Sequence, residues 1–324
     1  MISLLILSIA SFTISLLTVY LIKQRFSQQL LDIPNERSSH TQPTPRGGGL
    51  GFILAFGITS IVATVLGLPS HLTLWLVIIP LSIIGILDDF GGVSAGIRYL
   101  VQLSAASIVI FYFGSFFWGM ESMGIVGEVL TIGLTAIAIT ALINFYNFMD
   151  GLDGLLAGCS VIQLGFLAIY LNQPIFWLLV AAIFGFLWWN WSPAKIFMGD
   201  AGSTVLGATV AIALLLEDNP VRAWQAAAIT LPPVTDAVYT LVRRLLRQEN
   251  IFQAHRCHLY QRLQKSGWTH SQVAITYIII NIIVALNIGF LGTTGAICSL
   301  IGVICAIIAG EIYLSYQQPM TSKL

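Results

Sequence analysis

The sequence predicts an all-α, polytopic integral membrane protein that folds as one transmembrane domain over residues 1–324. Of the 324 residues, 57% are hydrophobic and only 9% are charged, and the mean hydropathy is +0.88. Apolar runs of membrane-spanning length follow one another along the chain, separated by short polar turns. Such a composition and pattern are typical of membrane proteins with about eleven helices, and not of a soluble domain with a large core.

The apolar runs give the expected helices in order. The first run has no basic residue before it, and Lys23 and Arg25 follow it directly, which favours a retained span over a cleaved signal peptide. The expected spans are 2–22, 47–67, 71–87, 98–117, 126–143, 155–171, 174–190, 201–216, 223–242, 271–291 and 294–315.

The positions of Lys and Arg predict the orientation of these helices. With the N-terminus outside, every second turn and the C-terminus face the cytoplasm. Together with Arg98 at the inner end of the fourth span, these segments hold thirteen of the fourteen Lys and Arg residues, and only Arg222 lies outside. The five expected cytoplasmic loops are 23–46, 88–97, 144–154, 191–200 and 243–270.

Charge and cysteine usage exclude two other classes of site. Fourteen basic residues balance fourteen acidic ones, and no dense basic cluster contains interleaved aromatic residues, so no nucleic-acid partner is expected. The four cysteines form no CxxC pair and three lie in apolar runs, so neither a disulfide framework nor a zinc site is expected.

The first loop ends in three glycines, Gly47–Gly49, at the start of the second span. Glycine lets a backbone approach a phosphate or another helix closely, but a hinge at the helix entry explains the triplet equally well. Arg37, His40 and Arg46 fit the positive-inside rule first and anion binding second.

The second loop begins with two adjacent acids, Asp88 and Asp89. Neighbouring residues on a helix point about 100° apart, so the two carboxylates cannot chelate one ion together. One is expected to face a site while the other meets a basic partner. Adjacent acids on the face that normally favours Lys and Arg are unusual, which favours a functional role over a solvated helix end.

The third loop, NFYNFMDGLDG at 144–154, carries the densest set of polar groups. Asn144 and Asn147 have helical spacing, and in a continuing helix Asp150 and Asp153 would share a face in the same way. Amide and carboxylate oxygens are the ligands that Mg²⁺ prefers, and Asn also reads the edge of a base or sugar. Helix capping alone is the weaker explanation for four polar groups with matching spacing.

In the fourth loop, Asp200 directly precedes the eighth span, after Pro193 has interrupted the seventh. This position is typical of a helix N-cap. It also aims Asp200 at a metal held at the mouth of the helix, while the backbone amides of Gly202 and Ser203 favour an anion.

The fifth loop is the longest and the most basic. His255 and His258 are three residues apart and suggest a metal pair, but no nearby Cys or acid completes a zinc site. With Arg256 between them, a phosphate clamp is favoured. Three arginines at the start of the loop fit the positive-inside rule: Arg243, Arg244 and Arg247.

Six motifs occur in the loops in this order: Asp32-Ile-Pro-Asn35 with Arg37 and His40, Pro43-Thr-Pro-Arg46-Gly-Gly-Gly49, Leu87-Asp-Asp89 followed by Arg98, Asn144-Phe-Tyr-Asn-Phe-Met-Asp-Gly-Leu-Asp-Gly154, Asn190 with Pro193-Ala-Lys-Ile-Phe-Met-Gly-Asp200-Ala-Gly-Ser203, and His255-Arg256-Cys257-His258. Through them the chain resembles, over essentially its whole length, the polyprenyl-phosphate N-acetylhexosamine-1-phosphate transferase superfamily, or glycosyltransferase family 4. The resemblance is strongest to the bacterial branch that starts O-antigen and related surface polysaccharides on undecaprenyl phosphate.

This resemblance implies roles for residues of the motifs. Asn147 and Asp200 would ligate Mg²⁺, with Mn²⁺ as a substitute. Asp200 would also be catalytic, together with Asp88 and Asp89, which serve catalysis or placement of the lipid phosphate. The implied substrate-binding residues are Asp150 and Asp153 in the nucleotide-sugar site, His255, Arg256 and His258 on the donor phosphates, and Asn35, Arg37, His40, Arg46, Arg98, Asn144 and Asn190.

The implied reaction joins a soluble donor to a lipid acceptor. A phosphate oxygen of undecaprenyl phosphate attacks the β-phosphorus of a UDP-N-acetylhexosamine, giving undecaprenyl-diphosphate-sugar and UMP. Many relatives have consecutive histidines where this chain has His258-Leu-Tyr260-Gln261, a form associated with the branch that uses N-acetylated deoxysugars. The expected setting is the bilayer of the inner (plasma) membrane, with the active site facing the cytoplasm; a homodimer is compatible with the sequence.

Three other classes share part of this pattern. A secondary transporter also keeps intramembrane carboxylates and broken helices, but here the acids cluster at one face and no half-chain repeat is present. CDP-alcohol phosphotransferases have Ala-Arg after their first Asp-Gly, whereas this chain has Leu155-Leu156-Ala157-Gly158. A lipid-binding scaffold differs from the enzyme in whether UDP-sugar binding depends on Mg²⁺.

Overall fold

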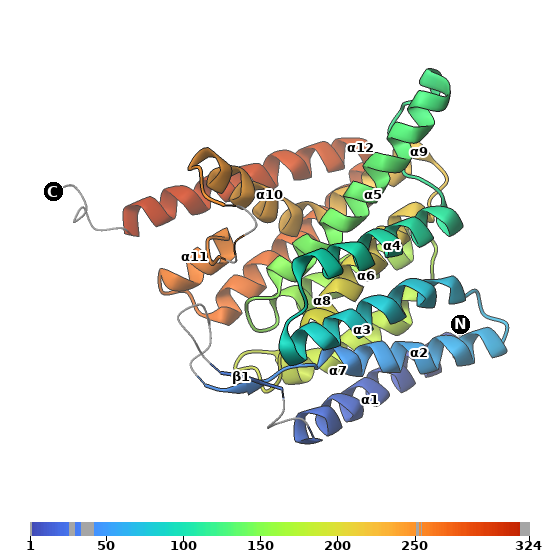
Figure 1. Cartoon of the computed structure of the whole chain (residues 1–324), viewed down its shortest axis with the longest axis horizontal. Helices are drawn as coiled ribbons and strands as arrows, with labels where there is room; N and C mark the ends of the chain where they lie inside the picture. Colours follow the sequence, from blue (N-terminus) through green and yellow to red (C-terminus); the bar gives the residue numbers. More distant parts are fainter. Residues whose placement is uncertain (1, 26–29, 34–41, 251–252, 254, 318–324) are drawn as a thin grey trace.

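The structure, a computed structural model, describes residues 2–25, 30–33, 42–250, 253 and 255–317, and its helical content confirms the all-α prediction (Figure 1). Its helices are α1 (Ile2–Arg25), α2 (Gly49–Val65), α3 (Trp75–Gly91), α4 (Ala95–Phe113), α5 (Gly124–Met149), α6 (Leu155–Tyr170), α7 (Phe176–Asn190), α8 (Asp200–Leu215), α9 (Pro220–Ala227), α10 (Leu231–Leu246), α11 (Leu259–Lys265) and α12 (His270–Gln317). Three short 3-10 turns, Leu72–Leu74, Glu121–Met123 and Ala228–Thr230, and two antiparallel strands, β1 (Leu31–Asp32) and β2 (Thr44–Pro45), join them.

Helix α8 forms the centre of the bundle. Its residues from Ala201 to Leu214 are all buried, and it packs against α2, α3, α5 and α6. Its many Ala, Gly, Ser and Thr residues allow the neighbouring backbones to approach closely, as small residues do in membrane helices. The outer helices expose large apolar side chains instead: Phe111, Ile125 and Phe290 are 81%, 80% and 83% exposed. Small residues at the centre and large apolar side chains on the outside suit a bundle surrounded by lipid.

Among the described residues, five helical segments are long and apolar enough to cross a membrane: Ile2–Arg25, Leu72–Gly91, Ala95–Phe113, Gly124–Met149 and His270–Gln317. Four shorter apolar helices, α2, α6, α7 and α8, accompany them. Within α12, Gly292 has a non-helical backbone. Because Trp268 packs on Tyr313 and Asn287 donates a hydrogen bond to Ser299, this helix is a hairpin. Its two arms match the tenth and eleventh expected spans; the total of eleven stays a prediction.

The structure breaks the ninth expected span, 223–242, into two helices. Helix α9 ends at Ala227, a 3-10 turn follows, and α10 begins at Leu231. Pro232 and Pro233 stand in the first turn of α10, where a missing N–H is tolerated, and their rings disfavour a continuous helix through this point. The expectation of one uninterrupted span was therefore wrong here.

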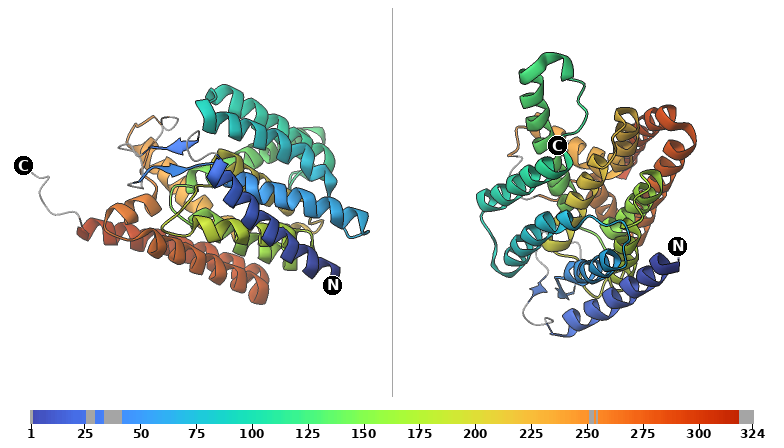
Figure 2. Two further views of the ribbon diagram at one scale, coloured as in Figure 1. Left: turned by 90° about the horizontal axis from the view of Figure 1, so that it is seen from below. Right: turned by 90° about the vertical axis from the view of Figure 1, so that its right-hand side faces the viewer.

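The described parts of the expected cytoplasmic loops gather at one end of the bundle. The start of α1 and the finish of α12 lie at opposite ends of the bundle, as the predicted odd number of crossings requires. Strand β1 and helix α11 lie at the end where α12 finishes (Figures 1 and 2). Hydrogen bonds connect the loops: Phe197 N–H to Pro45 O (2.8 Å), Ala194 N–H to Asp153 Oδ2 (3.1 Å), Tyr260 O–H to Phe148 O (2.8 Å) and Asp200 N–H to Asp89 Oδ1 (3.4 Å).

Two glycines bring helices into contact with the start of α8. A Cβ on Gly85 would lie 2.4 Å from Ala201 Cα, and one on Gly49 would lie 2.5 Å from Gly202 Cα. A larger residue at either position would therefore force the backbones apart. At Gly49 the close approach is to another helix, which was one of the two explanations for the glycine triplet. The contact at Gly85 places the last turn of α3 beside Asp200.

Candidate active site

A cavity of about 310 Å³ opens among the loops, and we call it the polar cleft. Helices α3, α4, α5 and α8 form one wall, which carries Asp88, Asn147 and Asp200. The segment before α11 forms the facing wall with His255 and His258. An apolar flank formed by Leu81, Ile84, Ala95 and Tyr99 continues from the polar groups. We refer to these as the acid wall, the histidine wall and the apolar flank.

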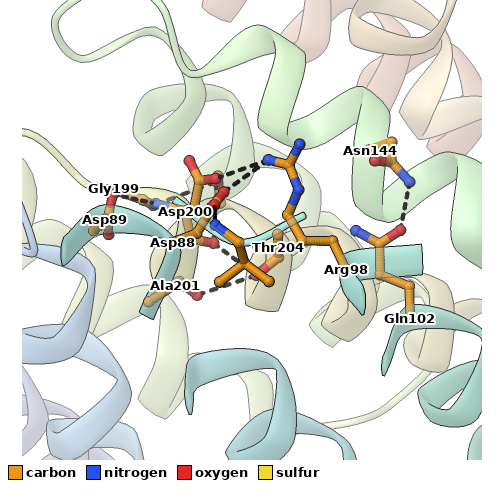
Figure 3. A network of polar contacts seen from close by, with 11 residues as sticks. Asp88, Asp89, Arg98, Gln102, Asn144, Gly199, Asp200, Ala201 and Thr204 are labelled. Atoms are coloured by element: carbon orange, nitrogen blue, oxygen red, sulfur yellow. Dashed lines mark hydrogen bonds and ion pairs between the residues drawn. The ribbon is translucent and has the colours of Figure 1, made fainter. Parts of the chain in front are cut away.

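Asp88 and Asp200 contact each other in the acid wall. Their carboxyl groups are within hydrogen-bonding contact, and Arg98 Nη1 lies 2.7 Å from Asp88 Oδ2 and 3.8 Å from Asp200 Oδ2 (Figure 3). The Val93 N–H donates to the second oxygen of Asp88. Two carboxylates in contact repel each other, so the Arg98 guanidinium stabilises the Asp88–Asp200 pair. A cation beside this pair is electrostatically favoured for the same reason.

Asp89 points away from Asp88, as the helical geometry predicts. The second expected loop begins later than 88, since α3 continues to Gly91, and both acids lie in its last turn. Asp89 Oδ1 accepts the Asp200 N–H, so it fixes the first residue of α8. The basic partner is Arg98 on Asp88, while Arg46 pairs with Asp32 at 2.6 Å and its charge also acts on Asp89.

Asp200 does not cap α8 in the way the sequence suggested. The N-cap is Gly199, which has no side chain to accept a capping hydrogen bond, and Asp200 is the first helical residue. Its carboxylate instead meets the side chain of Asn147 from the end of α5. The two predicted metal ligands are therefore in contact. Asp200 is inside the helix and not its N-cap because Asp89 Oδ1 accepts the Asp200 N–H, the first N–H of α8.

The second half of NFYNFMDGLDG is a turn and not a helix. Asn144 and Asn147 lie on α5, which ends at Met149, so Asp150 and Asp153 do not share a helical face. Asp150 is the C-cap of α5, and Gly154, in a left-handed conformation that suits glycine, is the N-cap of α6. Removal from water raises the pKa of Asp150 to about 8, and the negative charges of Asp200 and Asp89 act in the same direction.

Asp153 and Asn190 hold the loops together beside the cleft. Burial works to raise the pKa of Asp153, but the contact with His270 Nδ1 at 3.2 Å and the Ala194 N–H lower that pKa below its ordinary range. Asn190 is 4% exposed; it accepts the Gly154 N–H and donates to Ile196 O, both at 3.0 Å. In the described structure both side chains fasten the third loop to its neighbours.

Closely spaced aromatic rings make up the histidine wall. The ring centroids of His255 and His258 are 5.0 Å apart, and Phe148 lies 5.8 Å from His258 on another side. Arg256 stands between the two histidines in sequence, and its carbonyl accepts a hydrogen bond from Lys265 Nζ. The predicted ligands Asn35, Arg37 and His40 lie outside the described residues.

Gln102, Thr204 and Asp236 were not predicted from the sequence as residues of the site, and Arg244 was interpreted only as a positive-inside residue. Gln102 accepts a hydrogen bond from Asn144 Nδ2 at 2.7 Å, and Thr204 lines the cleft one turn after Asp200 (Figure 3). Both lie four residues after a recognised polar residue, on the same helical face, which is a signal that spacing could have supplied. Asp236 and Arg244 support the histidine wall from α10. An acid inside an expected span, such as Asp236, is itself a recognisable signal.

The donors of the acid wall suit a magnesium ion. Among the described residues, no group of three or more His, Cys, Asp or Glu side chains is arranged as a metal cage. Asp200 nevertheless contacts both Asp88 and Asn147, which brings two carboxylates and one amide together as hard oxygen donors. Because Mg²⁺ is usually held by one or two carboxylates together with waters and substrate phosphates, this set fits the ion.

Comparison with known proteins places the chain in a family. Residues 71–217, which include α3 to α8, match the model of glycosyl transferase family 4. This segment carries the whole acid wall and ends before the histidine wall. Together with the 30% identical relative described next, this match shows that the chain belongs to glycosyl transferase family 4.

Named relatives cover most of the chain. A Bacillus subtilis protein named probable undecaprenyl-phosphate N-acetylglucosaminyl 1-phosphate transferase is 30% identical over 305 residues, 86% of this chain and 83% of the relative. An Escherichia coli undecaprenyl-phosphate alpha-N-acetylglucosaminyl 1-phosphate transferase is 31% identical over 76% of this chain and 72% of its own length. A Mycobacterium tuberculosis decaprenyl-phosphate N-acetylglucosaminephosphotransferase is 29% identical over 75% of this chain and 70% of its length.

Proposed function

We propose that this member of glycosyl transferase family 4 transfers a sugar-1-phosphate from a UDP-sugar to undecaprenyl phosphate. The observation that carries the proposal is the polar cleft, in which acids, amides and histidines from separate loops meet beside an apolar flank. A soluble diphosphate and a membrane-bound phosphate both have access to such a place. The names of the relatives support a polyprenyl phosphate as acceptor and N-acetylglucosamine 1-phosphate as one transferable group. The sugar here is an N-acetylhexosamine or an N-acetylated deoxyhexose.

The proposed reaction exchanges one phosphoanhydride bond for another. An oxygen of the lipid phosphate bonds to the β-phosphorus of the donor, and the bond from that phosphorus to the bridging oxygen breaks. UMP leaves with the electron pair, and undecaprenyl-diphosphate-sugar remains in the bilayer. Phosphoryl transfer of this kind asks the protein mainly for positioning and for compensation of negative charge.

The residues of the two walls supply that positioning. Arg98, 42% exposed in its side chain, bridges Asp88 and Asp200 and is the cation nearest to an incoming lipid phosphate on the acid wall. The lipid phosphate is already largely ionised near neutral pH, so Asp88 has only a residual proton to accept. His255, Arg256 and His258 hold the donor diphosphate with charge-assisted hydrogen bonds. The apolar flank lies against the first isoprene units of the acceptor.

Magnesium is part of the proposal, with Mn²⁺ as a substitute. Asn147 and Asp200 would hold the ion, and Asp88 lies in contact with Asp200. When bound, the ion supplies positive charge that polarises the diphosphate and stabilises the departing UMP. Asp89 acts indirectly, because its hydrogen bond to the Asp200 N–H sets the position of that carboxylate.

The direct test offers purified protein undecaprenyl phosphate, Mg²⁺ and a panel of UDP-sugars. We expect one lipid product whose mass equals the acceptor plus a sugar-1-phosphate minus one water, with one UMP released per product, and no product when EDTA replaces Mg²⁺. Counterflow of a solute across proteoliposome membranes, with neither UMP release nor a lipid product, would favour the transporter alternative instead.

We further propose that the enzyme works at the cytoplasmic face of the plasma membrane and starts a surface polysaccharide such as O-antigen. Sealed vesicles of opposite orientation test the first part. Inside-out vesicles should convert added UDP-sugar directly, whereas right-side-out vesicles should need permeabilisation. Equal activity in intact right-side-out vesicles would contradict this orientation.

A further inference from the structure

A buried carboxylate stands behind the histidine wall. Asp236 lies on α10 and is 1% exposed. Four groups donate hydrogen bonds to it: Leu259 N–H at 2.9 Å, Tyr260 N–H at 3.1 Å, Tyr277 O–H at 2.6 Å and Thr240 O–H at 3.2 Å. A charge in this position is costly unless it is fully hydrogen-bonded. An apolar residue would serve packing alone at lower cost, so the carboxylate indicates a further role.

The same carboxylate faces an imidazole of the polar cleft. His258 Nδ1 lies 3.4 Å from Asp236 Oδ1, and His258 is also part of the cleft lining. The ring is held on its sides by Phe148, His255 and Tyr260, with centroids 5.8, 5.0 and 5.7 Å away. When Nδ1 faces a carboxylate, the opposite ring nitrogen, Nε2, is the one left for a ligand.

Asp236 also connects the histidine wall to the acid wall. Its two oxygens take the first two backbone N–H groups of α11, so a carboxylate from another helix fixes where α11 begins. Tyr260 reaches from that turn to Phe148 O on α5, one residue after Asn147. A shift of Asp236 would therefore move His258 relative to the acid wall.

We propose that Asp236 is a positioning residue for the transfer reaction, which holds His258 so that its Nε2 faces the diphosphate of the donor. The proposal rests on the proposed function, since it needs a donor in the polar cleft. Asp236 itself does not contact the substrate. A chain of two residues thus links the middle of α10 to donor binding.

Kinetics of Asp236→Asn measure this link. The amide keeps the shape but turns one acceptor into a donor that faces N–H and O–H groups. Because a hydrogen bond to a charged group is lost, KM for the UDP-sugar should rise about 10- to 100-fold, with a smaller change in kcat. Thr240→Val removes a donor to the same carboxylate from its own helix and should leave KM within about 3-fold of wild type.

A double variant separates positioning from general stability. If Asp236 acts through His258, then Asp236→Asn should add little to the KM of His258→Gln, whereas independent structural effects would multiply. Multiplying effects, or a wild-type KM in Asp236→Asn, would overturn the inference. Wild-type protein that makes no lipid product from any UDP-sugar would instead overturn the proposed function.

Nuclear magnetic resonance of wild-type protein with ¹⁵N-labelled histidine gives a test that needs no Asp236 variant. The chain has five histidines, and the His258→Gln spectrum identifies the signal of His258. We expect Nδ1 of His258 to carry a proton, because it faces the Asp236 carboxylate. A neutral ring protonated only at Nε2 would contradict the positioning role even if Asp236→Asn failed to fold.

Discussion

The two walls of the polar cleft are built in different ways. In the acid wall, Asp88, Asn147 and Asp200 lie at helix ends, and close helix packing such as that of Gly85 on Ala201 brings them together, with hydrogen bonds from their neighbours added to it. The histidine wall is a loop, and buried residues of α10 hold it from behind. The first wall depends mainly on the close approach of helix backbones, and the second on buried hydrogen bonds from α10.

Arg244 shows the second mode as clearly as Asp236 does. Only 5% exposed, it donates to Glu249 Oε2 at 3.0 Å, to Gln253 O at 3.0 Å and to Asn250 O at 2.8 Å. It thereby shapes the loop before the histidines, and Gln253 itself lines the cleft. Substitutions in the acid wall should therefore lower mainly the rate of transfer, while substitutions behind the histidine wall should weaken mainly donor binding.

The largest effect is expected for Asp200→Asn. Loss of one charge from the predicted metal ligands should lower kcat/KM at least about 100-fold, with insertion into the membrane unchanged. Asp218→Asn is the matched control, because Asp218 is exposed beyond the other end of α8. Near-normal turnover of purified Asp200→Asn would contradict the role of the acid wall.

Gly49→Ala should damage the acid wall through packing alone. The new Cβ would lie 2.5 Å from Gly202 Cα and 2.9 Å from Met198 O, both backbone atoms that cannot rotate away. We expect a loss of about 1–3 kcal/mol in the free energy of unfolding, together with lower kcat. Gly133→Ala is the control, since nothing lies within 4 Å of its Cβ. Equal melting temperatures for the two variants would show that this contact is not close.

Arg244→Gln should loosen the histidine wall. The shorter amide cannot keep all three contacts, so KM for the UDP-sugar should rise about 3- to 10-fold, while kcat and the dependence on Mg²⁺ change less. Arg247→Gln serves as the control, because Arg247 is exposed just past the end of α10. A fall in kcat without a rise in KM would break the division of labour between the walls.

The smallest effect concerns Asp150 in the turn beside the acid wall. Its pKa is raised from 3.8 to about 8, so between these values the unfolded chain loses the proton first, and stability falls as pH rises. Asp150→Asn removes this loss. Without metal, the variant should match wild type near pH 4 and exceed it at pH 8 by at least roughly 2–4 °C in Tm. A gain that is the same at both pH values would contradict the raised pKa.

The sequence predicted the helical class, the gathering of the loops and the acids, asparagines and histidines of the two walls, because these polar groups stand out at the ends of apolar runs. It could not show that Asp153 pairs with His270, since that contact joins residues 117 apart. The role of Asp236 was not predicted, because this acid lies inside an expected span and not in one of the loops. Packing across distant segments decides these details, and local patterns do not contain it.

Calorimetric titration with UDP tests most directly whether both walls act on one donor. We expect Mg²⁺ to strengthen UDP binding by wild-type protein, Asp200→Asn to abolish that Mg²⁺ effect, and Arg244→Gln to weaken binding while leaving the effect in place. UDP binding that ignores Mg²⁺, or that is unchanged in both variants, would mean that the donor does not lie between the acid wall and the histidine wall.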